Sequence, residues 1–307
     1  MKNLFPRSIK SSASTKKSTL SRIFFDTFDY CEEDDTLSEA VKTTVENQTV
    51  ILESDPLQIQ LAGFQSPAEV IVSDKRCIEA ASSYARKGQK VCVLNFASAG
   101  VTGGGVKEGE SALEESICRV STLFRSIARP EIWEKFYLPH RKNINPLHND
   151  DVIYSPEVVV FKSDVEFPEL LPETEWFKVD VLSCAAPNLR KKPGNAYNFD
   201  GDVPAEITDK QQLEIFTKRF ERIFKVAHAK GAEVLILGAF GCGAFRCKSS
   251  IVAKAAKTVA TLHPNWFKTV EFAVYSSSKR NNNLKAFAKA FNDTEVLKRF
   301  EQLQDAA

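Results

Sequence analysis

The feature that most restricts the fold of this chain is the alternation, from about residue 67 onward, of short β-branched runs with segments of helical period. Strands are expected at Ala68–Val72, Lys90–Phe96, Val158–Phe161, Val179–Cys184, Val234–Leu237 and Val270–Tyr275. Helices are expected at Cys77–Lys87, Leu213–Ala227, Ser249–Leu262 and Leu284–Gln304. This alternation is typical of an α/β sheet protein.

The charge balance argues against several classes of partner. Lys and Arg number 41 against 40 Asp and Glu, so the net charge is +1 and no broad basic field is available for nucleic acid. No run approaches the about 18 apolar residues of a membrane span. The seven scattered cysteines fit a reducing, cytoplasmic-type compartment better than a disulfide-stapled secreted fold.

The first 30 residues differ in composition from the rest. Residues 2–22 are basic and rich in serine, and no acidic residue precedes Asp26. We therefore expect a flexible leader over residues 1–30, followed by one domain over residues 31–307. The same composition is typical of mitochondrial transit peptides, so targeting is the alternative interpretation. Two later stretches, Arg129–Asp151 and 187–207, are expected to be long irregular loops near one mouth of the sheet.

Two glycine-rich turns follow expected buried strands. The first runs from Asn95 to the triplet Gly103, Gly104 and Gly105, where a missing Cβ lets a ligand lie against the main chain. A merely tight connection is the alternative. The second contains Gly238, Gly241, Cys242, Gly243, Ala244 and Phe245 and leads into the helix near Ser249. Backbone N–H groups at such a helix start form a cradle for phosphate or diphosphate.

Two adjacent acids open the helix that follows the glycine triplet. Glu114 and Glu115 fall in its first turn, close to both candidate phosphate cradles. Ser111 and Glu114 have capping-box spacing, so simple helix capping is the structural alternative. Adjacent helical residues point about 100° apart, so the two acids cannot flank one bond from opposite faces. We expect them to divide ligand binding and proton transfer.

Other reactive side chains give weaker signals. His140, His148, His228 and His263 have no metal-ligand spacing, and Cys242 and Cys247 lack a second pair, so no metal site is predicted. Cys242 precedes a helix start that would stabilise a thiolate, but no partnering histidine is evident. We therefore interpret Cys242 as a small packing residue of the turn.

The segment VLNFASAGVTGGGVKEGESALEESICRVSTLF resembles the signature of the microbial-type poly(ADP-ribose) glycohydrolase family, a branch of the macrodomain superfamily. DVIYSPEVVVFKSD, VDVLSCAAPN and LGAFGCGAFR are also similar, in family order, and the resemblance covers about residues 40–290. It implies a three-layer α/β/α macrodomain with a mixed, largely parallel central sheet. It also implies that ADP-ribose and ADP-ribosylated proteins are the partners, with no cofactor.

The resemblance also assigns roles to residues. It implies that Glu115 is the catalytic acid and that Glu114 binds ribose hydroxyls. The ligand-binding positions implied are Asn95, Gly103, Gly104, Gly105, Gly241, Cys242, Gly243, Ala244 and Phe245. The sequence departs from the family pattern at two places that bear on cleavage of the ribose–ribose linkage. Leu113 replaces the family Gln beside the two acids, and Cys247-Lys248-Ser249 replaces the usual Asn and Pro after the second glycine turn.

We therefore expect an ADP-ribosyl glycohydrolase that cleaves the bond at the anomeric carbon of the distal ribose, with Glu115 as general acid and base. The substrate is either mono-ADP-ribosylated protein, arginine-linked forms included, or poly(ADP-ribose). The alternative is a non-catalytic macrodomain that reads ADP-ribose without turnover.

Overall fold

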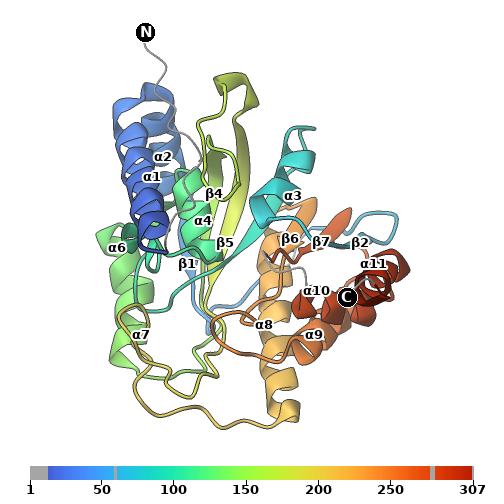
Figure 1. Cartoon of the computed structure of the whole chain (residues 1–307). Helices are drawn as coiled ribbons and strands as arrows, with labels where there is room; N and C mark the ends of the chain where they lie inside the picture. Colours follow the sequence, from blue (N-terminus) through green and yellow to red (C-terminus); the bar gives the residue numbers. More distant parts are fainter. Residues whose placement is uncertain (1–12, 59–60, 277–280, 306–307) are drawn as a thin grey trace.

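The computed structural model describes residues 13–58, 61–276 and 281–305, and it contains one seven-stranded sheet (Figure 1). The strands are β1 (Thr49–Ile51), β2 (Glu69–Ser73), β3 (Val91–Phe96), β4 (Val152–Val160), β5 (Phe177–Cys184), β6 (Val234–Leu237) and β7 (Thr269–Ala273). Their order is β1-β4-β5-β3-β6-β7-β2, antiparallel at β1-β4-β5 and parallel from β5 to β2. The sheet is therefore mixed and largely parallel, as predicted.

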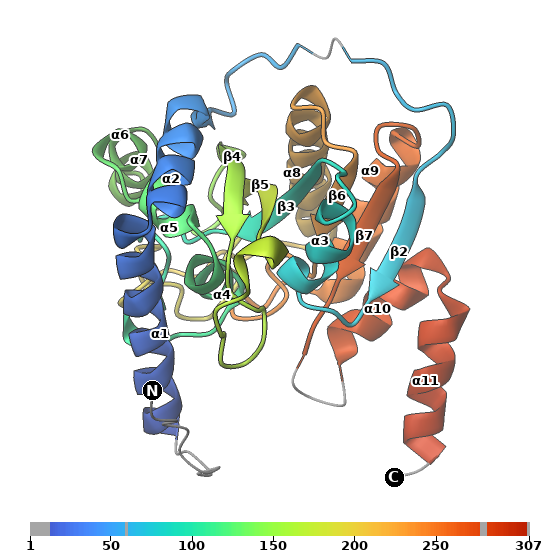
Figure 2. The same ribbon diagram turned by 90° about the horizontal axis from the view of Figure 1, so that it is seen from above.

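Helices cover both faces of the sheet, because neighbouring residues of its central strands face opposite cores. Cys92 and Leu94 of β3 join one core, while Val91 and Val93 of the same strand join the other. The first core includes α8 (Asp209–Ala229), α9 (Ser249–Leu262) and α10 (Asn282–Phe291). The second includes α3 (Cys77–Ala85), α4 (Leu113–Val120) and α5 (Leu123–Ile127). Figure 2 shows these layers from above, and they confirm the three-layer α/β/α prediction.

The sheet register places the loops that follow β3, β5 and β6 at the same end of the sheet. Phe96 and Cys184, the last residues of β3 and β5, are paired, and β6 runs parallel on the other side of β3. The carboxyl ends of all three strands therefore lie together. In open α/β sheets, ligands bind in the crevice outside the carboxyl ends of the strands.

The flexible leader expected over residues 1–30 is wrong for the described part, because α1 (Ala13–Glu33) is a continuous helix. Leu20 and Phe24 of α1 are buried, and the Phe24 ring meets the Phe124 ring edge-on with centroids 4.8 Å apart. The predicted boundary between residues 30 and 31 falls inside this helix. Residues 1–12 lie outside the described residues. A second helix, α2 (Asp35–Asn47), follows after one residue.

Three other predictions need correction. The stretch Arg129–Asp151 is helical in its first half, as α6 (Pro130–Ile132), the π-helical turn η2 (Trp133–Tyr137) and α7 (Leu138–Lys142). The C-terminal helix breaks at Asn292, whose φ is 58°, into α10 and α11 (Thr294–Asp305). The strand expected at Val158–Phe161 is longer: β4 begins at Val152 and continues through a bulge between Ser155 and Val158. The remaining short helices are η1 (Val106–Glu108) and η3 (Glu173–Glu175).

Candidate active site

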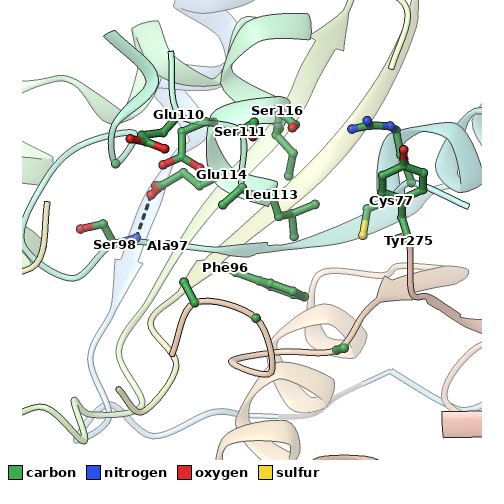
Figure 3. A pocket seen from close by; sticks show the side chains of 18 of the residues that line it. Cys77, Phe96, Ala97, Ser98, Glu110, Ser111, Leu113, Glu114, Ser116 and Tyr275 are labelled. Atoms are coloured by element: carbon green, nitrogen blue, oxygen red, sulfur yellow. Dashed lines mark hydrogen bonds between the residues drawn. The ribbon is translucent and has the colours of Figure 1, made fainter. Parts of the chain in front are cut away.

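A cavity of about 770 Å³ lies at the carboxyl ends of β3, β5 and β6 (Figure 3). Phe96, Ala186 and Ala239, which stand at or just after the ends of these strands, all line it. The start of α4 forms one wall and the second glycine turn forms the opposite one. The two glycine turns predicted from the sequence therefore meet at one cavity.

The first turn of α4 presents Glu114 to this cavity and does not use it as a cap. The residue before the helix is Ala112, which provides no side-chain cap, so the capping-box interpretation of Ser111 and Glu114 is wrong. Instead, Glu114 Oε2 accepts a hydrogen bond of 2.8 Å from the backbone N–H of Ser98. Glu114 Oε1 accepts a longer one, 3.4 Å, from Asn95 Nδ2. The carboxylate of Glu114 is therefore fixed from both sides.

Glu115 differs because one of its oxygens is uncommitted. Its Oε1 accepts a hydrogen bond of 3.0 Å from the backbone N–H of Gly105. Its Oε2 is buried and has no hydrogen-bond partner in the described part of the chain. Gly104, with φ of 58°, allows this arrangement, since a Cβ there would lie 2.5 Å from Glu115 Oε1.

Burial changes the acidity of both carboxyls. Burial raises the pKa of Glu114 well above its ordinary value, and the neighbouring Glu115 charge raises it further. Burial also raises the pKa of Glu115, although the Gly105 N–H and the Arg119 cation oppose the shift. In this site a carboxyl therefore stays protonated at a higher pH than an exposed carboxyl would. A general acid must carry a proton, so this environment suits general acid catalysis.

The second glycine turn has free donors where it lines the cavity. Among the described residues, no hydrogen bond engages the backbone N–H groups of Gly243, Ala244 or Phe245. Gly241 has φ of 74°, and a Cβ there would lie 3.0 Å from Cys247 Sγ. Burial raises the pKa of Cys242 well above its ordinary value, so a reactive thiolate is disfavoured there, in line with the packing role.

Most of the predicted site residues line the cavity, but not all. Gly104, Glu114, Glu115, Gly241, Gly243, Ala244 and Phe245 line it. The cavity lining does not include Asn95, Gly103, Gly105 or Cys242. Asn95 is fully buried and contacts Glu114 and Ser183, so it positions an acid behind the cavity wall. Gly105 acts in the same way through its N–H.

Several lining residues were not singled out from the sequence. Arg190, Tyr197 and Asn198 come from the expected 187–207 loop, which is irregular and does border the cavity. At the far end, the Arg76 guanidinium lies 4.2 Å from the centroid of the Tyr275 ring. Their positions, before α3 and just after β7, follow from the same strand-end rule that located the glycine turns.

Within residues 13–58, 61–276 and 281–305, no helix is long and apolar enough to cross a membrane. The same part of the chain contains no cluster of three His, Cys, Asp or Glu side chains suited to a metal ion.

A mixed seven-stranded sheet between two helical layers, with paired carboxylates at a glycine-lined strand-end cavity, defines a macrodomain-like protein. Residues 18–163 match the sequence pattern of the family described as microbial-type PARG, catalytic domain. The chain is accordingly an enzyme similar to the microbial-type poly(ADP-ribose) glycohydrolases, as the sequence motifs predict. No curated protein sequence matches the chain.

Solved structures agree with this placement. The chain is similar to a poly(ADP-ribose) glycohydrolase from Thermomonospora curvata, with a TM-score of 0.74 and 26% identity over 89% of this chain and 99% of the other. The same enzyme bound to the inhibitor ADP-HPD gives a TM-score of 0.72 at 26% identity, with the same coverage of both chains. A Deinococcus radiodurans poly(ADP-ribose) glycohydrolase in complex with ADP-ribose gives 0.69 at 26% identity, over 83% of this chain and 97% of that one.

Proposed function

We propose that this protein removes ADP-ribose from modified substrates by hydrolysing the bond at the anomeric carbon of the distal ribose, with Glu115 as general acid and base. The Glu115 carboxyl carries this proposal, because it lies in the cavity wall and its buried Oε2 has no hydrogen-bond partner among the described residues. The ADP-ribose and ADP-HPD complexes of the similar enzymes support the choice of ligand.

The chemistry follows from where charge develops. Cleavage gives the anomeric carbon oxocarbenium character, and the leaving oxygen or nitrogen needs a proton. Glu115, with its raised pKa, donates that proton and then, as a carboxylate, activates a water molecule. The free N–H groups of the second glycine turn bind the diphosphate without adding a competing charge near the carboxyls.

Glu114 has a different role in this scheme. Its two oxygens are already oriented by Ser98 and Asn95, so it is placed to accept hydrogen bonds from ribose hydroxyls and fix the sugar. A fixed sugar keeps the anomeric carbon beside Glu115, which is the positioning effect that makes general acid catalysis efficient.

The substrate is proposed as a class: ADP-ribosylated protein, carrying either single ADP-ribose units or poly(ADP-ribose). Leu113, which replaces the family Gln, lines the cavity and places an apolar side chain next to the two acids. Rates of ADP-ribose release from polymer and from arginine-, serine- and glutamate-linked single units, measured side by side, identify the linkage.

The deciding experiment is Glu115→Gln. Loss of the general acid is expected to lower the rate of ADP-ribose release by about 10²- to 10⁴-fold. The affinity for free ADP-ribose, measured by calorimetry, is expected to change little because the shape of the side chain is kept. Glu173→Gln, at an exposed acid on η3, is the matched control and should retain the wild-type rate.

Two results would contradict the proposal. Undiminished release by Glu115→Gln would show that this side chain is not the acid. Tight binding of ADP-ribose by the wild-type protein with no release from any of the four substrates would identify a reader of ADP-ribose.

A further inference from the structure

His148 has a buried side chain that the mechanism above does not use, and it stands behind three parts of the cavity wall. Its Nδ1 lies 2.7 Å from the carbonyl oxygen of Ala186, just after β5, and its Nε2 lies 2.9 Å from Asp200 Oδ1, in the 187–207 loop. Its ring centroid is 6.2 Å from that of Phe245, in the second glycine turn. Ala186 and Phe245 both line the cavity. The imidazole therefore joins three elements of the site from behind.

The two polar contacts of His148 together need a proton on each ring nitrogen. A carbonyl oxygen and an ionised carboxylate only accept hydrogen bonds, whereas a neutral imidazole has a single N–H to donate. The imidazolium satisfies both acceptors and forms an ion pair with Asp200. The two side chains are 3% and 6% exposed, so water does not readily replace a bond that is lost. Loss of the proton leaves the Nε2 lone pair facing the carboxylate in a buried place.

Asp200 carries this link into the 187–207 loop. Its Oδ2 accepts a hydrogen bond of 2.6 Å from Asn188 Nδ2, at the start of the loop. The carbonyl oxygen of the next residue, Gly201, accepts one of 2.7 Å from the backbone N–H of Gly194. The chain between these residues is thus closed at its base, and His148 ties that base to the chain outside the loop.

The tip of the same loop lies against the groups that hold the two acids. Tyr197 lines the cavity, and its carbonyl oxygen accepts a hydrogen bond of 2.9 Å from the Ser98 hydroxyl. The backbone N–H of Ser98 binds the Glu114 carboxylate (Figure 3). The Tyr197 ring also reaches Gly105, since a Cβ there would lie 3.2 Å from Tyr197 Cε1. The position of this loop therefore shapes the cavity beside both acids.

We propose that His148, protonated on both ring nitrogens, is a positioning residue that holds the 187–207 loop against the cavity, so that ADP-ribose binds more weakly as pH rises and this histidine loses its proton. The proposal rests on the function proposed above, because ADP-ribose must be the ligand of the cavity. Glu115 lies outside the loop, so release of the loop raises KM more than it lowers kcat.

One other histidine lies close enough to need a separate test. The His140 ring is 6.1 Å from that of His148, and its nitrogens contact the Phe136 carbonyl oxygen and Asn149 Oδ1. The charged side chains nearby have partners of their own: Asp150 pairs with Lys218 and Arg219, Asp151 accepts hydrogen bonds from Asn149 and the Glu53 N–H, and Arg190 lies 5.9 Å from the Phe245 ring centroid.

Asp200→Asn separates the two histidines. The amide oxygen still accepts from Asn188, while the amide nitrogen donates to Nε2 of a neutral His148, so the loop stays in place without the extra proton. Calorimetry with ADP-ribose would compare the two proteins from about pH 5 to about pH 9, across the range in which histidines titrate. The affinity of the wild-type protein should fall about ten-fold relative to that of the variant as pH rises.

His148→Ala removes both contacts. It should bind ADP-ribose about ten-fold more weakly than the wild-type protein at the low end of the pH range and match it at the high end. Asp202→Asn, at an exposed acid of the same loop, is the matched control. It removes the same charge without touching the link, and it should keep the wild-type pH dependence.

Hydrogen exchange tests the loop without any ligand. The amide protection of residues 188–201 should decrease with rising pH in the wild-type protein and stay constant in Asp200→Asn. Constant protection in the wild-type protein would overturn the proposal. The same pH dependence of ADP-ribose affinity in both proteins would also overturn it, by assigning the titration to His140 or to the acids. Wild-type binding with the expected pH dependence, but no release of ADP-ribose from any substrate, would refute the hydrolase and support the role of His148.

Discussion

Glu114 and Glu115 are adjacent in the chain but have different surroundings, because consecutive helical side chains point about 100° apart. Glu114 accepts hydrogen bonds from Ser98 and Asn95, whereas Glu115 accepts one from Gly105 of the glycine loop. Residue type and sequence position identify both acids as candidates. Only the packed structure shows which one keeps a free oxygen.

The close contact between Gly104 and the Glu115 carboxyl gives a prediction for a single residue. Gly104→Ala would place a methyl group 2.5 Å from Glu115 Oε1, so the carboxyl must move. We expect the rate of ADP-ribose release to fall by about ten-fold or more, since small displacements of a catalytic group are costly. Steady-state kinetics measures the effect.

Gly88→Ala is the control for Gly104→Ala. Gly88 also has a positive φ, 79°, but a Cβ there would meet nothing within 4 Å. It should therefore show only the cost of backbone strain, about 1 kcal/mol of stability, with an unchanged rate. Equal rate losses in both variants would refute the steric explanation.

At the scale of elements, α1 shows how a basic, serine-rich composition can hide an ordered helix. Its apolar residues Leu20, Phe24 and Cys31 are spaced to share one face, and all three are buried. Lys17 Nζ also pairs with Glu110 at 2.5 Å, and Leu20 lines the cavity. The helix is thus part of the wall of the site, and a boundary at residue 30 would cut through it.

The packing of α1 yields a paired prediction. Phe24→Ala removes a ring that is 1% exposed, and we expect the free energy of unfolding to fall by about 3 kcal/mol or more. Phe25→Ala, at a neighbouring ring that is 47% exposed, should change it by about 0.5 kcal/mol or less. Urea denaturation of both variants checks this, and equal small effects would mean that α1 does not pack on the body in solution.

At the scale of the whole molecule, a buried acid links stability to pH. The pKa of Glu114 is raised in the folded state, mainly by burial, so the folded protein binds its proton more tightly than the unfolded chain does. The stabilisation from this group is complete below the ordinary pKa of 4.5 and is lost as pH rises toward the raised value.

Glu114→Gln should remove this dependence, because an amide of the same shape does not titrate. Relative to the variant, the wild-type protein is expected to lose about 1.4 kcal/mol of unfolding free energy per pH unit across that window. Urea denaturation at several pH values from about 4.5 upward measures the difference. Parallel curves for the two proteins would show that Glu114 is not held protonated by burial.

The alternating strands and helices and the two glycine turns could be predicted from the sequence, because strand and helix periodicity and glycine are local signals. The three layers and the largely parallel sheet were implied by the resemblance to a known family. The sequence also placed two acids at a helix start. Only the packed structure shows that Asn95 acts through Glu114 and that α1 closes one wall of the cavity. Those relations join residues far apart in the chain, and their distances are set only when the elements pack.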